Sequence, residues 1–212
     1  QEFFGLPFIV SPDVLIPRGD SETLVEAALE ARPDAVRVLD CGTGSGALLL
    51  AVLHELPRTN GVGIDRSEQA LGVAKANATR LGLGERARMI RADWNSDGWR
   101  DDLGGPFDLI LANPPYVETD AALDPTVKDH EPAGALFAGP DGLDDYRVLV
   151  PQLPALLSDQ GVALVEIGHT QADAVTAIGA VAGLVATLHR DLAGRPRVLE
   201  FKKALGNAAV KA

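Results

Sequence analysis

Short apolar runs alternate with helix-like segments along most of this chain, and this alternation constrains the fold more than any other feature. The runs that resemble buried strands are residues 36–40, 61–65, 87–91, 107–112 and 162–167. The segments with helical spacing are one that begins at Ser21, then 47–56, 67–81, 143–157 and 172–181. Such alternation is typical of a parallel sheet with helices on both faces. We therefore predict a doubly wound α/β fold.

The two ends of the chain complete this picture. Residues 185–188 and 198–201 predict a closing antiparallel pair, which makes a mostly parallel, seven-stranded, Rossmann-like sheet with an antiparallel terminal strand. Residues 1–20 are rich in aromatic residues and prolines and predict an irregular or hairpin-like lead-in. We expect one domain over residues 21–203 and a frayed tail over 204–212.

Composition limits the classes of function. The chain has 212 residues and a net charge of −11, with its basic residues scattered, so it lacks the basic face of proteins that hold nucleic acid through many phosphates. The acidity suits a cationic small molecule. The single cysteine, Cys41, excludes an internal disulfide and suggests a reducing, cytoplasmic location. No apolar run approaches the ~20 residues that span a bilayer, so we expect no membrane partner.

A glycine-rich segment, Asp40-Cys41-Gly42-Thr43-Gly44-Ser45-Gly46, joins the first predicted strand to the following helix. Glycines at such a turn let the backbone approach a ligand closely, and the helix amino end favours anionic groups. Gly42, Gly44 and Ala47 also satisfy the dinucleotide pattern G-x-G-x-x-G/A. Two features favour S-adenosylmethionine instead: Asp40 precedes the glycines, where it could meet an ammonium group, and the third glycine follows after one residue.

Acidic residues end the next two predicted strands. Asp65, about 20 residues beyond the glycines, can accept hydrogen bonds from ribose hydroxyls. Its alternative role is to cap the helix from Ser67 onward. Asp93 could accept from an adenine amino group while the Trp94 ring covers the base. Without a cofactor, the same pair would be a surface acid and a ring at the edge of the core.

Asn113-Pro114-Pro115-Tyr116 follows the apolar run at 107–112, and its chemistry suits methylation of a planar, weakly nucleophilic nitrogen. The Asn113 side chain can accept a hydrogen bond from an N–H. The prolines stiffen the backbone and lack N–H groups of their own, so a carbonyl there can face a second substrate N–H. The Tyr116 ring offers a flat surface to an amide or base. The alternative is a strand end followed by a proline turn.

No metal site is predicted. His130 lies between acids in Asp129-His130-Glu131-Pro132, but sequence neighbours seldom converge on one ion, so a structural role in the loop is the better interpretation. The other histidines have no ligand spacing, and Ser45 has no partners for nucleophilic catalysis.

Together, the glycine loop, Asp65 and Asn113–Tyr116 resemble class I S-adenosylmethionine-dependent N-methyltransferases. Further stretches are similar to the protein-(glutamine-N5) methyltransferases, and most similar to the branch that modifies peptide chain release factors. These stretches are residues 8–18, 130–147 and 191–197. One difference is at Gly19: the family usually has a proline followed by an acid after the arginine, whereas here Gly19 stands between Arg18 and Asp20. The family also carries a small helical amino-terminal domain, so we expect these residues to cover the catalytic domain only.

The resemblance implies a reaction, a cofactor and a partner. The methyl group of S-adenosylmethionine would pass to the glutamine N5 of the Gly-Gly-Gln loop in a release factor, with no direct binding of nucleic acid. The implied catalytic residues are Asn113, Pro114, Pro115 and Tyr116. The implied cofactor-binding residues are Asp40, Gly42, Thr43, Gly44, Gly46, Asp65, Asp93, Trp94 and Asn113.

Three alternatives stay open at this point. Asn-Pro-Pro-Tyr also serves methyltransferases that act on adenine N6 or similar amino groups of nucleic acids. A module that binds the cofactor without catalysis would share the glycine loop and Asp65. A nicotinamide dehydrogenase has the glycine pattern in its favour but lacks a candidate proton donor.

Overall fold

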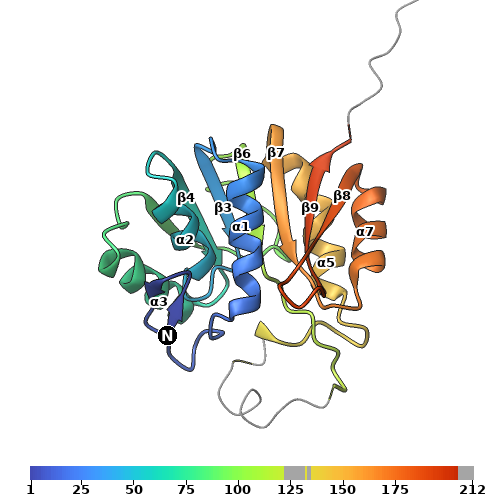
Figure 1. The fold of residues 1–212 in the computed structure, drawn as a ribbon, viewed down its shortest axis with the longest axis horizontal. Coiled ribbons are helices and arrows are strands. Elements are labelled where there is room, and N and C mark those ends of the chain that lie inside the picture. Colours follow the sequence, from blue (N-terminus) through green and yellow to red (C-terminus); the bar gives the residue numbers. More distant parts are fainter. Residues whose placement is uncertain (122–131, 133–134, 205–212) are drawn as a thin grey trace, which may run out of the picture.

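The computed structural model describes residues 1–121, 132 and 135–204 (Figure 1). The His130 loop and the tail from residue 205 lie outside these residues. The lead-in begins with a small antiparallel hairpin of β1 (Glu2–Phe3) and β2 (Leu6–Pro7). This hairpin occupies the first residues of the predicted lead-in, and the division of the chain at residues 20 and 203 stays a prediction.

Seven strands form one sheet in the order β5-β4-β3-β6-β7-β9-β8. Their bounds are β3 (Arg37–Cys41), β4 (Asn60–Asp65), β5 (Ala87–Arg91), β6 (Phe107–Ala112), β7 (Leu157–Glu166), β8 (Leu184–Arg190) and β9 (Pro196–Lys203). Strands β3 to β7 pair in parallel, and β9 runs antiparallel to both β7 and β8. The predicted seven-stranded, mostly parallel sheet is confirmed, with β9 inserted between β7 and the edge strand β8.

Helices cover both faces of the sheet. One face carries α1 (Glu22–Ala31), which follows a 3-10 turn at Gly19–Ser21, and α2 (Ala47–Glu55) and α3 (Glu68–Arg80). The other carries α5 (Asp144–Leu149), α6 (Leu153–Leu156) and α7 (Ala172–Val181). Side chains of β6 alternate between the two cores, Leu109 and Leu111 on one side and Ile110 and Ala112 on the other. This is the doubly wound arrangement.

Two predicted bounds are wrong for local reasons. The helix expected over residues 143–157 is divided into α5, a 3-10 turn at Val150–Gln152 and α6. Pro151 and Pro154 lack the N–H groups that a continuous helix needs. Strand β7 begins at Leu157, earlier than the expected residue 162, and its pairing with β6 shifts register between Phe107 and Leu109.

Candidate active site

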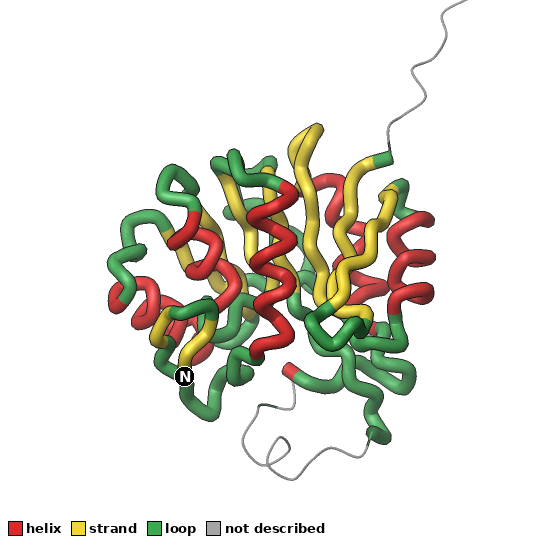
Figure 2. Tube along the Cα trace, in the orientation of Figure 1, coloured by secondary structure: helices red, strands yellow, loops and turns green. Residues whose placement is uncertain are grey.

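A cavity opens at the carboxyl ends of the parallel strands, where the connecting loops lie along the lower edge of the view in Figure 2. Ligands of doubly wound sheets bind at this edge. Much of the wall comes from the lead-in over residues 13–18, the glycine loop, residues 65–67 at the end of β4, residues 92–95 after β5, and Asn113 with Pro115 after β6. The structure thus brings most of the predicted site residues together.

The glycine loop has a backbone that other residues rarely adopt. Gly42, Gly44 and Gly46 all have positive φ angles, of 75°, 54° and 82°. Gly42 and Thr43 each donate an N–H to the carbonyl of Ile64, at 2.9 and 2.8 Å, which fixes the loop to β4. A Cβ on Gly44 would meet nothing nearer than 4.0 Å, so the missing side chain leaves open space at the cavity wall.

Asp40 lies beneath this loop and not on the cavity wall. It is completely buried, and its Oδ2 accepts a 2.6 Å hydrogen bond from the Thr43 hydroxyl. Its Oδ1 has no hydrogen-bond partner. Burial raises the pKa of Asp40 to about 7, although the bond from Thr43 opposes this shift. Asp40 therefore supports the loop from behind, through Thr43.

The Asp65 carboxylate accepts hydrogen bonds from two backbone N–H groups at the cavity wall, whereas the cap of α3 is Ser67. Its Oδ1 accepts from the Ser67 N–H at 2.8 Å, next to the helix cap that Ser67 itself provides to Ala70. Its Oδ2 accepts from the Gly44 N–H at 3.0 Å. The carboxylate also lines the cavity. These bonds hold it in one orientation at the wall.

Trp94 lies against the glycine loop, and a Cβ on Gly42 would come within 3.2 Å of its ring. Its indole N–H donates to Asp145 Oδ1 at 3.0 Å. Asp93 Oδ1 accepts from both the backbone and side-chain nitrogens of Asn95, at 2.9 and 3.0 Å. Asp93, Trp94, Asn95 and Asp145 all reach the cavity. Burial raises the pKa of Asp145, with the bond from Trp94 opposing it.

The Asn113–Tyr116 segment divides between the cavity and the protein interior. Asn113 and Pro115 line the cavity, whereas Pro114 is buried and Tyr116 is not among the lining residues. The Tyr116 hydroxyl donates to Glu166 Oε1 at 3.4 Å. Burial, together with the negative charge of Glu166, raises the pKa of Tyr116 to about 12, so the phenol is neutral.

The lead-in is a wall of the site that sequence reasoning did not assign. Residues 13–18 line the cavity opposite the strand ends, and Asn77 of α3 holds the chain just before them. Asn77 Oδ1 accepts from the Ile9 N–H at 2.7 Å, and its Nδ2 donates to the carbonyls of Ile9 and Ser45 at 3.0 and 2.9 Å. The sequence feature that could have indicated this contact is Asn77 itself, a polar residue on the apolar face of α3.

Acidic side chains predominate on the cavity wall. Asp13, Asp65, Asp93 and Asp145 line it, against Arg18 and Arg66. This balance suits a ligand that carries positive charge. Among the residues that the structure describes, no group of acids, histidines or cysteines has the arrangement to hold a metal ion. In the same residues, no helix has the length and apolar character to cross a bilayer.

Comparison with known proteins first defines the class. A family model described as a methyltransferase domain matches residues 33–173, which include the glycine loop, Asp65 and the Asn113–Tyr116 segment. The structure of a ribosomal protein L11 methylase from Lactobacillus delbrueckii subsp. bulgaricus has a TM-score of 0.64 at 22% identity, over 92% of this chain and 83% of that one. That likeness shows the fold, and the fold and family model together define a methyltransferase domain.

Sequence relatives then narrow the class. A release factor glutamine methyltransferase of Bradyrhizobium diazoefficiens is 42% identical over 212 residues, 96% of this chain and 70% of that protein. One from Agrobacterium fabrum is 41% identical over 212 residues, 96% of this chain and 72% of that protein. The chain therefore belongs to the release factor glutamine methyltransferase family, which confirms the resemblance found in its sequence.

Proposed function

We propose that this chain transfers the methyl group of S-adenosylmethionine to the side-chain N5 of a glutamine, in the Gly-Gly-Gln loop of a peptide chain release factor. One observation carries the reaction: Asn113 and Pro115 lie on the wall of the same cavity as the glycine loop and Asp65. An amide acceptor and a cofactor cradle therefore share one space. Family membership supports the substrate and, with it, a cytoplasmic location.

The residues present fit S-adenosylmethionine. Gly44 leaves open space where a side chain would project, and acids predominate on the wall. The buried Asp40 has an oxygen without a hydrogen-bond partner beneath the loop. When the Asp40 carboxyl ionises, it adds negative potential at the loop. We assign the methionine end to the glycine loop with Asp40 behind it, the ribose to Asp65, and the adenine to Asp93 and Trp94.

The cofactor supplies a sulfonium methyl group that is already electrophilic, so the protein mainly has to position the glutamine amide. With the cofactor bound, the amide nitrogen would gain the methyl group as the C–S bond breaks with the electron pair left on sulfur. The nitrogen would then lose a proton to solvent. No general base is needed if the proton leaves after methyl transfer.

Each residue of the Asn113–Tyr116 segment has a part in that positioning. The Asn113 side chain accepts one amide N–H and the Pro114 carbonyl accepts the other, which orients the nitrogen lone pair and favours nitrogen as it gains positive charge. Pro115 stiffens the turn. The Tyr116 ring follows Pro115 at the edge of the cavity, and we assign it to pack against the amide plane of a seated glutamine.

The test is transfer of labelled methyl from S-adenosylmethionine to a purified release factor, beside a variant of that factor with Gln→Ala in the Gly-Gly-Gln loop. We expect label on the normal factor only. Label on both factors would place the modification elsewhere. Label in DNA or RNA would identify a nucleic-acid amino methyltransferase instead, and calorimetric cofactor binding without any turnover would indicate a non-catalytic module.

A further inference from the structure

Glu166 is a buried acid beside the candidate catalytic segment to which the proposed mechanism gives no role. It ends β7, and the preceding residue, Val165, pairs with Ala112, the residue before Asn113. Its side chain is nearly inaccessible. Burial raises the pKa of Glu166, although Ser21 and Arg197 oppose the shift. A carboxyl kept in such a place costs stability unless its partners compensate.

The partners of Glu166 come from separate parts of the site. Its Oε1 accepts from the Tyr116 hydroxyl at 3.4 Å, and Ser21, which lines the cavity, lies close enough to oppose the rise in its pKa. Its backbone carbonyl accepts from the Tyr146 hydroxyl at 2.9 Å. One residue therefore connects the segment after β6 with α5.

Arg197 lies near Glu166 but is held by other acids. Its Nη2 donates to Asp20 Oδ2 at 2.9 Å and to Asp191 Oδ2 at 3.2 Å. Neither Arg197 Nε nor Glu166 Oε2 has a hydrogen-bond partner. Arg197 thus offsets the charge of Glu166 without closing an ion pair with it, and Glu166 can direct its Oε1 at Tyr116.

The backbone of Tyr116 is already fixed. Its carbonyl accepts from Gln171 Nε2 at 3.1 Å, and the same nitrogen donates to the Gly142 carbonyl at 3.1 Å. The ring lies against Gly168, where a Cβ would come within 3.4 Å of Tyr116 Cδ2. The ring also packs against the core on this face of the sheet. The bond to Glu166 adds a polar constraint at the far end of the ring.

We propose that Glu166 is a positioning residue that sets the orientation of the Tyr116 ring against the substrate amide. This inference rests on the proposed function and deepens it. The 3.4 Å distance is long for an O–H···O bond, and such bonds often tighten only when substrate is bound. Glu166 acts most when the glutamine is seated, so its loss lowers kcat and spares cofactor binding.

A double-mutant cycle tests this inference. Glu166→Leu removes the acceptor at similar volume, and Tyr116→Phe removes the donor and keeps the ring. Each change is expected to lower kcat about tenfold, because small misplacements near the reacting atoms are costly. If Glu166 acts through the Tyr116 hydroxyl, the double variant also loses about tenfold, since coupled sites are not additive. A loss of about a hundredfold in the double variant would overturn the proposal.

Three further variants and measurements separate positioning from folding. Glu166→Gln keeps an oxygen that can accept from Tyr116 and should retain more activity than Glu166→Leu. Glu200 is a buried acid on β9 that pairs with His189 and Lys202. Glu200→Gln is the matched control and should leave kcat unchanged. The Kd for S-adenosylmethionine should stay within about twofold in all of them. If Glu166→Leu is too unstable to assay, the cycle is run with Glu166→Gln, whose loss must vanish in the Tyr116→Phe background.

A spectroscopic measurement decides the inference independently of turnover. The chain has two tyrosines, so ¹³C-tyrosine labelling gives two ring signals, which Tyr146→Phe assigns. In Glu166→Leu, the Tyr116 Cζ signal should move and the ring should flip faster, while Glu200→Gln should leave both unchanged. An unchanged Tyr116 signal would overturn the proposal. Absence of methyl transfer by the unaltered protein would instead overturn the proposed function.

Discussion

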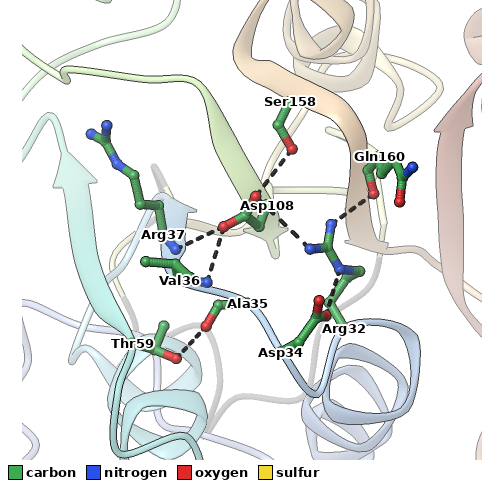
Figure 3. A network of polar contacts seen from close by, with 9 residues as sticks. All are labelled: Arg32, Asp34, Ala35, Val36, Arg37, Thr59, Asp108, Ser158 and Gln160. Atoms are coloured by element: carbon green, nitrogen blue, oxygen red, sulfur yellow. Dashed lines mark hydrogen bonds and ion pairs between the residues drawn. The ribbon is translucent and has the colours of Figure 1, made fainter.

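Polar side chains at the two ends of the parallel strands differ in how completely they are hydrogen-bonded. At the amino end, Asp108 of β6 accepts from the N–H groups of Val36 and Arg37, at 2.9 and 3.1 Å, and from the Ser158 hydroxyl at 3.1 Å (Figure 3). Arg32 lies 3.9 Å away and also donates to a β7 carbonyl. Burial by itself would raise the pKa of Asp108, but these donors outweigh it and lower the pKa.

At the carboxyl end, some buried polar atoms have no hydrogen-bond partner. In the part of the chain that the structure describes, the buried side-chain atoms without a hydrogen-bond partner are Asp40 Oδ1, Glu166 Oε2 and Arg197 Nε, and all three lie at this end. Unpaired buried groups cost stability and concentrate where a protein has another use for them. The comparison indicates that one end of the sheet stabilises the fold and the other end is arranged for a ligand.

The largest effect should come from the ligand-binding end. Asn113→Ala removes an acceptor for the substrate amide and should lower kcat by about 10³-fold, the size found for loss of one preorganised group. Cofactor affinity, measured by calorimetry, should change little because the glycine loop and Asp65 are untouched. Equal losses of activity and cofactor binding would contradict the role of Asn113 in orienting the amide.

A change at the amino end should lower stability and leave activity unchanged. Asp108→Ala leaves the Val36 and Arg37 N–H groups without their acceptor and should lower the free energy of unfolding by about 3 kcal/mol. Urea denaturation measures this change. The kcat of the folded variant should match that of the unaltered protein, and a marked loss of kcat would mean that the two ends are not separate in function.

The contributions of the two ends to stability should change with pH in opposite directions. The pKa of Asp40 is raised from 3.8 to about 7, so the folded state binds more protons than the unfolded state between these values. Stability is therefore lost as pH rises through this window, with a slope of at most about 1.4 kcal/mol per pH unit from this group. The pKa of Asp108 is lowered, so its contribution is present above 3.8 and is lost at more acidic pH.

Asp40→Asn isolates this effect, because asparagine can still accept from Thr43 and carries no charge. Its unfolding free energy, measured in urea at pH 5 and pH 8, should fall less between the two values than that of the unaltered protein. The exposed Asp159→Asn provides the control and should follow the unaltered protein. Parallel profiles for Asp40→Asn and the unaltered protein would exclude the raised pKa.

The smallest effect should come from the bond between Trp94 and Asp145. Trp94→Phe keeps an aromatic ring against Gly42 but removes the N–H that donates to Asp145. Cofactor affinity should weaken about threefold, or about 0.7 kcal/mol, the ordinary net value of one hydrogen bond. Calorimetry measures it. Asp145→Asn, which keeps an acceptor oxygen, should have less effect, and the opposite order would point to a direct role for the Asp145 charge.

Sequence patterns predicted the regular parts of the fold well. The strands at 87–91 and 107–112 and the helix at 172–181 have the predicted bounds, because their apolar spacing is uninterrupted. The break at Pro151 and Pro154 and the early start of β7 were missed, because an apolar pattern continued past the prolines and polar residues begin the strand.

The candidate site was predictable only where its residues adjoin strand ends. The glycine loop and Asn113–Tyr116 follow strands directly, so local spacing was enough to find them, and their assigned roles remain predictions. Glu166 and Asp145 meet Tyr116 and Trp94 from 50 and 51 residues away along the chain. No local pattern encodes such contacts, which depend on the order of the strands in the sheet.

The hydrogen bonds of Asn77 limit where residues can be inserted into or deleted from this chain. It holds Ile9 and Ser45 together from the last turn of α3 and is the eleventh residue counted from the Ser67 cap. Inserting or deleting one residue between the cap and Asn77 would turn its amide by about 100° around the helix and release both segments. Changes in chain length within α3 are therefore compatible with this site only beyond Asn77, towards the turn at Gly82.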